Sequence, residues 1–205
     1  MSDLLTNLGA AVLLSREELL RLIRSAPHRY KTYQIPKRNP GQFRTIAQPA
    51  REVKTLQYWV MKHVLNHFSI HPAATGYRNG LSIAENARRH VKGRYLLKLD
   101  FKDFFPSIKS TDLRLYIKKN ASKTFTDMDV DALSRILFWN PRHTDDMCLS
   151  IGAPSSPVLS NILLKDFDDL IAKFCSGLRV SYTRYADDCA PRAQRAEEGP
   201  MCVTA

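Results

Sequence analysis

Apolar side chains recur every three or four residues in several stretches of the chain, which is the spacing of an amphipathic helix. A serine followed three positions later by a glutamate opens two of these stretches, at Ser15 and at Ser82, and this pair caps the first turn of a helix. Ser156 before Pro157 marks a further helix start. The pattern predicts helices at about 15–26, 51–68, 82–91, 111–120, 127–139 and 156–174.

Alternation of apolar and polar positions predicts strands elsewhere. Residues 31–35 and 43–47 alternate on either side of a turn signal, Asn-Pro-Gly at 39–41, and so predict a β-hairpin rich in positive charge. Two more runs of strand length, 94–99 and 180–185, each lead into aspartates. The expected fold is α+β, with acidic residues at the ends of strands.

Composition changes this picture in one respect. A chain of 205 residues with 44% hydrophobic and 25% charged residues is typical of an ordinary globular protein of one large or two small domains. Its formal net charge of +11 is unusual, however, and favours a polyanionic partner such as a nucleic acid.

The cysteines and the N-terminus bear on the compartment. Cys148, Cys175, Cys189 and Cys202 include no pair at metal-binding spacing, and no histidines are placed to complete a zinc site. Reduced thiols in the cytoplasm are therefore expected. The short apolar stretch near the N-terminus lacks preceding basic residues, so neither a signal peptide nor a membrane partner is expected.

The strand-terminal acids are the candidate chemistry. If their strands are neighbours, Asp100, Asp187 and Asp188 converge at one edge of a sheet. Carboxylate oxygens suit Mg²⁺, and two such ions about 4 Å apart can promote phosphoryl transfer. The alternative is that the Asp187-Asp188 pair belongs to a turn or a helix cap, which aspartate also favours. The strand before the pair and the acid upstream favour a metal site.

Four segments resemble the sequence boxes of reverse transcriptases, and they occur in the family's order. YADD at 185–188 resembles the active-site box, and LDFKDFFPSI at 99–108 resembles the first catalytic box. GAPSSPVLSNI at 152–162 resembles the box near the nucleotide and the template, and RTIAQPAREVKTLQ at 44–57 resembles the fingers box. The resemblance implies a right-hand polymerase fold with fingers and a partial palm, an antiparallel sheet with packed helices.

A further pattern narrows the subgroup. Asn86, Ala87 and His90 match the NAxxH pattern of bacterial retron reverse transcriptases, with group II intron-type enzymes as the alternative. Without the resemblance, Asn86 and His90 are a pair one helical turn apart that packs or bonds locally.

The resemblance implies a role for each matching residue of the catalytic boxes. Asp100, Asp187 and Asp188 would hold two Mg²⁺ ions, with Asp100 and Asp187 bridging both and the backbone carbonyl of Phe101 assisting. Phe105 matches the bulky residue that lies beneath the sugar and excludes a ribose, although it also fits an ordinary core phenylalanine.

The other boxes imply nucleotide contacts. Arg44, Arg51 and Lys54 match the basic positions of the fingers box and suit triphosphate oxygens, although each also fits a solvated surface charge. The predicted helix at 156 is preceded by Gly152, Ala153 and Pro154. The small residues in this segment would let the backbone approach the base pair. Ile151 stands where the family usually has glutamine.

The implied function is DNA synthesis from a structured noncoding RNA template, through an RNA–DNA hybrid and deoxynucleoside triphosphates. Membership in a retron further implies an effector protein partner and a role in defence against phage. Two alternatives remain open: a noncatalytic RNA-binding remnant and an RNA-templated RNA polymerase.

The resemblance also divides the chain. It predicts an N-terminal helical region at 1–28, fingers at 29–92, a partial palm with fingers insertions at 93–188 and an aberrant tail at 189–205. The tail has no Ile, Leu, Phe, Tyr or Trp, and Pro191 cannot donate to a sheet. We therefore expect the second strand of the active-site hairpin and the thumb to be absent, through a frameshift, a premature stop or a natural short form. Such a chain alone would polymerise weakly or not at all.

Overall fold

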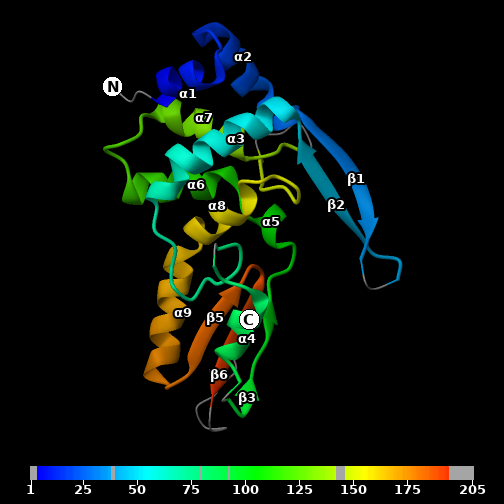
Figure 1. Ribbon diagram of the computed structural model, residues 1–205, viewed down its shortest axis with the longest axis vertical. Helices are drawn as coiled ribbons and strands as arrows, with labels where there is room; N and C mark the ends of the chain where they lie inside the picture. Colours follow the sequence, from blue (N-terminus) through cyan, green and yellow to red (C-terminus); the bar gives the residue numbers. More distant parts are fainter. Residues whose placement is uncertain (1–3, 38–39, 79, 92, 142–145, 194–205) are drawn as a thin grey trace. The chain divides into compact units, whose positions relative to one another are not determined.

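The computed structural model describes residues 4–37, 40–78, 80–91, 93–141 and 146–193 (Figure 1). The chain divides into two compact units, the first made of residues 1–67 and 105–156 and the second of residues 68–104 and 157–205. Across the described ranges, no helix has both the length and the apolar character needed to span a bilayer. The last twelve residues, 194–205, lie outside the described part, and they include Cys202.

Helices form the core of the first unit, as their apolar spacing predicts. The capping box at Ser15 is confirmed, because the Ser15 hydroxyl accepts from the Glu18 amide and the Glu18 carboxylate accepts from the Ser15 amide. The helices of this unit that contact one another are α1 (Leu4–Val12), α2 (Arg16–Ser25), α3 (Arg51–His63), α6 (Ser110–Asn120) and α7 (Asp127–Leu137), with short 3₁₀ turns η1 (Ala26–His28) and η2 (Leu65–His67).

The apolar faces of α3 and α7 pack together, and one polar side chain lies between them. Val53 and Val60 of α3 and Ile136 of α7 are fully buried. Gln57, also fully buried, donates through its amide nitrogen to the Ile136 carbonyl at 2.9 Å and to the Tyr30 hydroxyl at 3.1 Å. This amide therefore links α3 to α7 and to the start of the hairpin.

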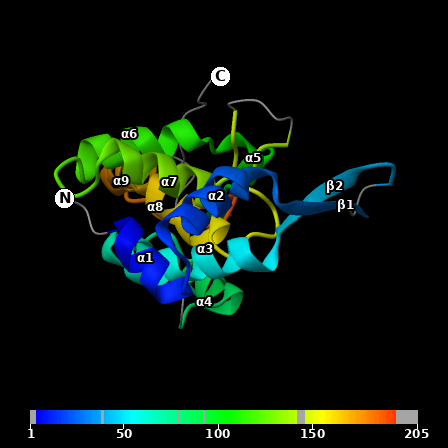
Figure 2. The ribbon, with the colours of Figure 1, turned by 90° about the horizontal axis from the view of Figure 1, so that it is seen from above.

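The predicted hairpin is confirmed. Strand β1 (Tyr30–Pro36) pairs antiparallel with β2 (Phe43–Pro49), so that Tyr30 lies opposite Pro49. The hairpin extends beyond the helices of its own unit (Figure 2), which explains why most of its side chains are exposed. The turn signal at 39–41 lies partly outside the described residues.

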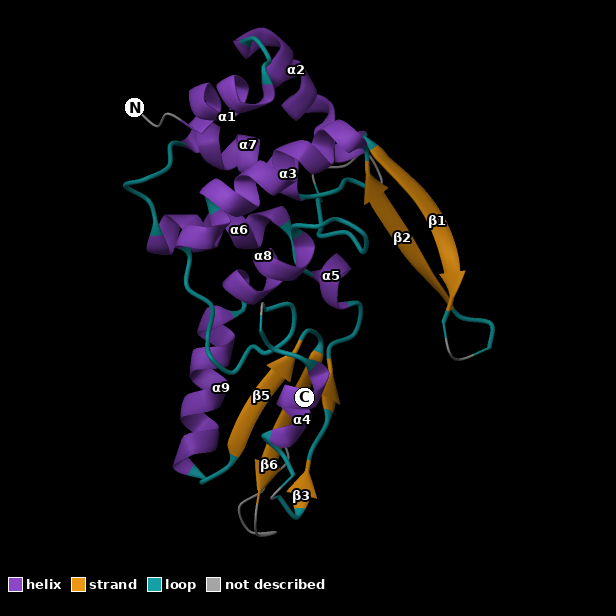
Figure 3. Cartoon of the chain, viewed as in Figure 1, coloured by secondary structure: helices purple, strands orange, loops and turns teal. Residues whose placement is uncertain are grey.

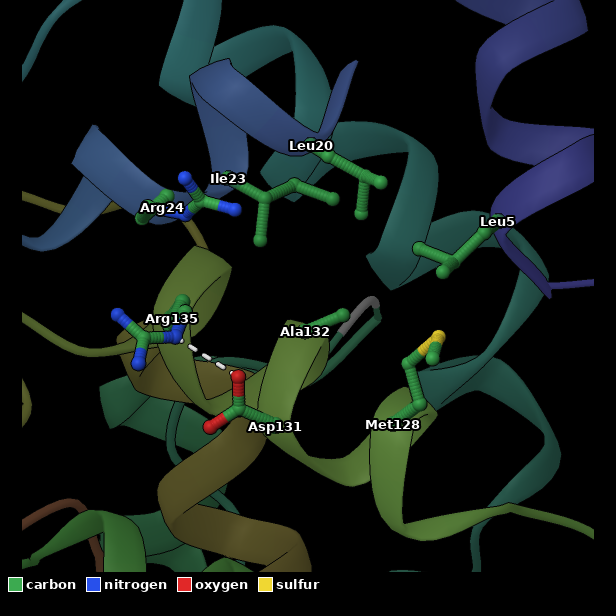
Figure 4. A pocket seen from close by; sticks show the side chains of 8 residues that line it. All are labelled: Leu5, Leu20, Ile23, Arg24, Met128, Asp131, Ala132 and Arg135. Carbon is green, nitrogen blue, oxygen red and sulfur yellow. Dashed lines mark hydrogen bonds and ion pairs between the residues drawn. The ribbon is translucent and has the colours of Figure 1, made fainter. Parts of the chain in front are cut away.

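A small pocket of about 200 Å³ lies between α1, α2 and α7 (Figure 4). Its lining mixes apolar side chains with charged ones, among them Asp131, which accepts from Arg135 at 2.8 Å and from Arg114 at 3.0 Å. Burial alone would raise the pKa of Asp131, but the hydrogen bonds and charges of the two arginines outweigh it and hold that pKa below its ordinary value. None of the acids predicted to bind metal lines this pocket.

The second unit contains an antiparallel sheet (Figure 3). Its strands are β3 (Tyr95–Leu96), β4 (Leu99–Asp100), β5 (Ser181–Tyr185) and β6 (Asp188–Ala193). Strand β6 is central, with β5 along one edge and both β3 and β4 along the other.

The expectation that no strand follows the Asp187-Asp188 pair was wrong. Strand β6 alternates in burial, with Cys189, Pro191 and Ala193 buried, but these residues are small and escape a search for large apolar side chains. Pro191 cannot donate, yet its carbonyl accepts from the Leu97 amide at 3.0 Å. The sheet therefore tolerates a proline in its central strand.

The remaining helices are α4 (Ile83–Arg88), α5 (Phe104–Ser107), α8 (Ser156–Leu163) and α9 (Lys165–Gly177). Two predictions need correction here: the single helix expected at 156–174 is two helices that meet at Leu164, and α4 is shorter than expected. Both α4 and α9 contact β5, and the α+β class with antiparallel sheets is confirmed.

Candidate active site

Strand pairing brings the three acids together along the backbone. Asp100, the last residue of β4, lies opposite Asp188, the first residue of β6. The amide of Phe101 donates to the Asp187 carbonyl at 3.1 Å. The acids therefore meet at one edge of the sheet, although β4 neighbours β6 rather than the strand that leads into the pair.

A tight turn connects β5 to β6 and carries Ala186 and Asp187. Ala186 has φ of +58°, in the left-handed region that costs an L-residue energy, and its side chain is buried. Gly76 packs directly against this turn, because a β-carbon at Gly76 would lie 2.7 Å from the Ala186 amide nitrogen. The turn is thus held in an uncommon conformation by closely packed neighbours.

Aromatic packing fixes the position after Asp100. The Phe101 ring lies 5.8 Å from the Phe104 ring and 5.4 Å, edge-on, from the ring of Phe167 on α9. Through these contacts Phe101 ties the end of β4 to α9.

Lys98 places a positive charge beside the acids. Its ammonium group lies 3.0 Å from an Asp188 carboxylate oxygen. This hydrogen bond and the charge of Asp188, with smaller contributions from Asp100 and Asp187, raise the pKa of Lys98. Lys98 is largely exposed, so water and salt screen the pair.

The donor chemistry of the three acids fits Mg²⁺, since all are carboxylates at a partly open sheet edge. Yet in the ranges that the structure describes, no three His, Cys, Asp or Glu side chains are grouped closely enough to hold a metal ion. The two-magnesium prediction stays a prediction.

A buried ion pair beneath the turn was not anticipated. Arg184 of β5 and Asp168 of α9 are both fully buried, and the guanidinium donates to both carboxylate oxygens, at 2.9 and 2.7 Å. Asn161 of α8 accepts from the same guanidinium at 3.1 Å. A signal existed in the sequence, because Asp168 interrupts the apolar face that Leu164 and Ile171 define.

The NAxxH residues contact the strand that leads to the acids. Asn86 accepts from the Thr75 hydroxyl at 2.9 Å, and the Thr75 amide donates to the Arg184 carbonyl at 2.8 Å. His90, just beyond α4, lies 2.6 Å from the Thr183 hydroxyl through its Nε2. Ala87 is exposed. The two polar residues therefore bond to tertiary partners and not to each other.

The three basic residues predicted to bind the nucleotide lie on two elements of the first unit, β2 and α3. Arg44 is exposed on β2, Arg51 is exposed at the start of α3, and Lys54 is half-buried one turn later. A shallow pocket of about 610 Å³ is lined by Lys54 but not by the other two, and its lining also includes Arg29 and Lys31.

The loop before α8 lies against β2. The Ile151 carbonyl accepts from the Ala47 amide at 2.8 Å, so the residue that replaces the family's glutamine contributes a backbone bond. Gly152 has φ of +121°, Ala153 is buried and Pro154 is half-buried. Phe105 is half-buried in α5. The roles predicted for these residues stay predictions.

Comparison with known proteins identifies the family. Residues 35–204 match the family described as reverse transcriptase (RNA-dependent DNA polymerase), and the chain belongs to that family. The relatives that it matches are reverse transcriptases of retrons, the subgroup whose NAxxH pattern Asn86, Ala87 and His90 match.

Its relatives include the retron Ec83 reverse transcriptase of Escherichia coli, 41% identical over 83% of this chain and 54% of that protein. The retron Ec86 reverse transcriptase of the same organism is 34% identical over 93% of this chain and 57% of that protein. The retron Mx162 reverse transcriptase of Myxococcus xanthus is 32% identical over 89% of this chain and 41% of that protein. The chain spans about half the length of these relatives.

Proposed function

We propose that this chain synthesises DNA on an RNA template by two-metal nucleotidyl transfer, with Asp100, Asp187 and Asp188 as the metal ligands. The observation that carries the proposal is the β4–β6 register, which sets Asp100 opposite Asp188 while the Phe101 amide binds the Asp187 carbonyl. Three carboxylates at one sheet edge are the donor set that Mg²⁺ prefers.

In this proposal the metal would supply activation of the attacking hydroxyl and charge neutralisation at the phosphates. The chain's own residues bind and orient. The three carboxylates and the Phe101 carbonyl would hold the ions, and release of Asp188 from Lys98 would complete the set. Arg44, Arg51 and Lys54 would bind triphosphate or template phosphates, and Phe105 would favour deoxynucleotides over ribonucleotides.

We also propose the substrate and the partner of this chain. The template would be a structured noncoding RNA, bound as an RNA–DNA hybrid in the cytoplasm, and the chain would act with a retron effector protein in defence against phage. The retron type of the relatives and the net charge of +11 support an RNA partner.

Primer extension on an RNA template with Mg²⁺ and deoxynucleotides tests the proposal. Strand β6 supplies the hairpin strand that was expected to be missing, which was one ground for expecting weak activity. The expectation that this chain alone polymerises weakly or not at all stays a prediction. Any extension by the wild-type chain should fall at least about a hundredfold in Asp187→Asn and in Asp100→Asn, because each removes a proposed metal ligand. Extension unchanged in both variants would refute the metal role. Incorporation of ribonucleotides instead would indicate an RNA polymerase.

A second candidate is a noncatalytic RNA-binding protein. Two observations favour it. Asp188 is paired with Lys98. Among the described residues, no three acidic, histidine or cysteine side chains lie close enough together to hold a metal ion. Filter binding separates the candidates when it is run beside extension. If the chain binds structured RNA, extends no primer and is indifferent to Asp100→Asn, the second candidate holds.

A further inference from the structure

We propose that Arg184, fixed by Asp168 and Asn161, is a positioning residue that sets the conformation of the Ala186–Asp187 turn and so the direction of the adjacent acids. The part of this inference that concerns metal binding rests on the proposed function. The part that concerns the conformation of the turn does not depend on that function.

The geometry of the guanidinium carries the argument. One edge of Arg184, through Nε and Nη2, is bound by both oxygens of Asp168. The remaining nitrogen, Nη1, donates to the Ala186 carbonyl at 3.0 Å and to the Asn161 side chain at 3.1 Å. One rigid planar group therefore joins α8, α9 and the turn that precedes the acids.

Each partner of Arg184 is itself held in place. Asp168 also accepts from the Tyr182 hydroxyl at 2.8 Å. Asn161 donates to the Gly76 carbonyl at 2.8 Å, and Gly76 is the residue that packs against the Ala186 amide. The network thus reaches the turn from two sides, through a carbonyl and through a close backbone contact.

The turn needs such support. Ala186 is in the left-handed region, which an alanine leaves readily unless its surroundings hold it there. The bond from Arg184 is made to the peptide between Ala186 and Asp187, so it restrains the residue whose side chain would bind metal. A buried ion pair adds little stability compared with apolar replacements, which leaves positioning as the reason for its presence.

The test uses Arg184→Lys in the full chain. Lysine keeps the charge beside Asp168, but its single ammonium cannot copy the fork that reaches both Asp168 and the Ala186 carbonyl. Two quantities are measured: Mn²⁺ affinity by titration, and amide hydrogen exchange of the peptide covering residues 185–190. Thermal unfolding confirms that the variant is folded. Arg135→Lys, which perturbs the Asp131 pair of α7, is the matched control.

We expect Arg184→Lys to weaken Mn²⁺ binding about tenfold and to speed exchange in 185–190, while the control changes neither. Adding Ala186→Gly should recover about fivefold of the affinity, because glycine adopts a positive φ without the steric cost. A folded Arg184→Lys variant with wild-type affinity and wild-type exchange overturns the inference and leaves Arg184 a core residue.

Two further comparisons keep the outcomes separate. If Arg184→Lys does not fold, Arg184→Met with Asp168→Leu removes both charges together and carries the same expectation. If wild-type Mn²⁺ binding is absent or insensitive to Asp100→Asn, the proposed function fails, and exchange in 185–190 alone then decides the inference. Faster exchange in the variant supports it, and equal exchange refutes it.

Discussion

The Lys98 ammonium binds Asp188. This hydrogen bond, together with the charges of the three acids, raises the pKa of Lys98. In the proposed function Asp188 would bind a metal ion, and that ion would then compete with Lys98 for the Asp188 carboxylate.

Removing that competition gives a residue-scale prediction. Lys98→Met should tighten Mn²⁺ binding by no more than about fivefold, because water and salt screen an exposed ion pair and leave it weak. Titration of wild type and variant measures the change. Lys118→Met, an exposed lysine on α6, should leave the affinity unaltered, and weaker binding in Lys98→Met would show that Lys98 assists the metal.

Gly152 gives a second prediction at this scale. Its φ of +121° disfavours any side chain, and a β-carbon there would lie 3.1 Å from both the Ala47 carbonyl oxygen and Ile46 Cγ2. Gly152→Ala should therefore lower the free energy of unfolding by about 1–3 kcal/mol in chemical denaturation. Gly177→Ala at the end of α9, where a β-carbon meets nothing within 4 Å, should be neutral or slightly stabilising. Equal effects would contradict the steric argument.

Among the secondary-structure elements, the contact between His90, just beyond α4, and Thr183 of β5 is expected to depend on pH. Burial of the His90 imidazole, reinforced by the charges of Arg192 and Arg89, lowers the pKa of His90. The unfolded chain takes up the proton near the ordinary pKa of about 6.5, whereas the folded chain does so only at lower pH. Acidification below about pH 6.5 therefore favours the unfolded state.

The expected outcome is a fall in the melting temperature as pH drops from about 7 towards 5.5, part of which disappears in His90→Gln. An identical pH profile for His90→Gln and wild type would mean that His90 does not titrate differently on folding.

The elements that were predicted correctly carry strong local signals. The serine-glutamate cap starts α2 at its predicted place, and alternation predicts the β1–β2 hairpin. The end of α8 was missed because residues 158–174 keep one apolar stripe across Leu164, where the helix axis breaks. Periodicity reports which face is buried, but it is blind to a change of axis.

For the whole molecule, the net charge of +11 predicts how RNA binding depends on salt. Binding that neutralises about five phosphates of single-stranded RNA should weaken roughly a hundredfold between 50 and 200 mM salt. Arg44→Gln combined with Lys31→Gln, both exposed on the hairpin, should make the salt dependence shallower. Asp100→Asn should leave it unchanged, and a salt-independent affinity would exclude phosphate contacts as its main source.

Local sequence signals were sufficient for the family, the fold class, the capped helices and the acids at strand ends, because each depends on residues close together in the chain. Local signals could not predict which of these elements pair or pack with one another. That β6 is the central strand depends on its pairing with β3 and β4, which lie about 90 residues earlier in the chain.

The surroundings of the acids were likewise decided by tertiary structure. Arg184 and Asp168 are charged, and charged residues belong at the surface unless each finds its partner. Only the packing of α9 against β5 brings them together, buries both and turns the guanidinium towards the Ala186 carbonyl. Sequence can identify the acids of this site, whereas their support arises from contacts between residues that no local pattern connects.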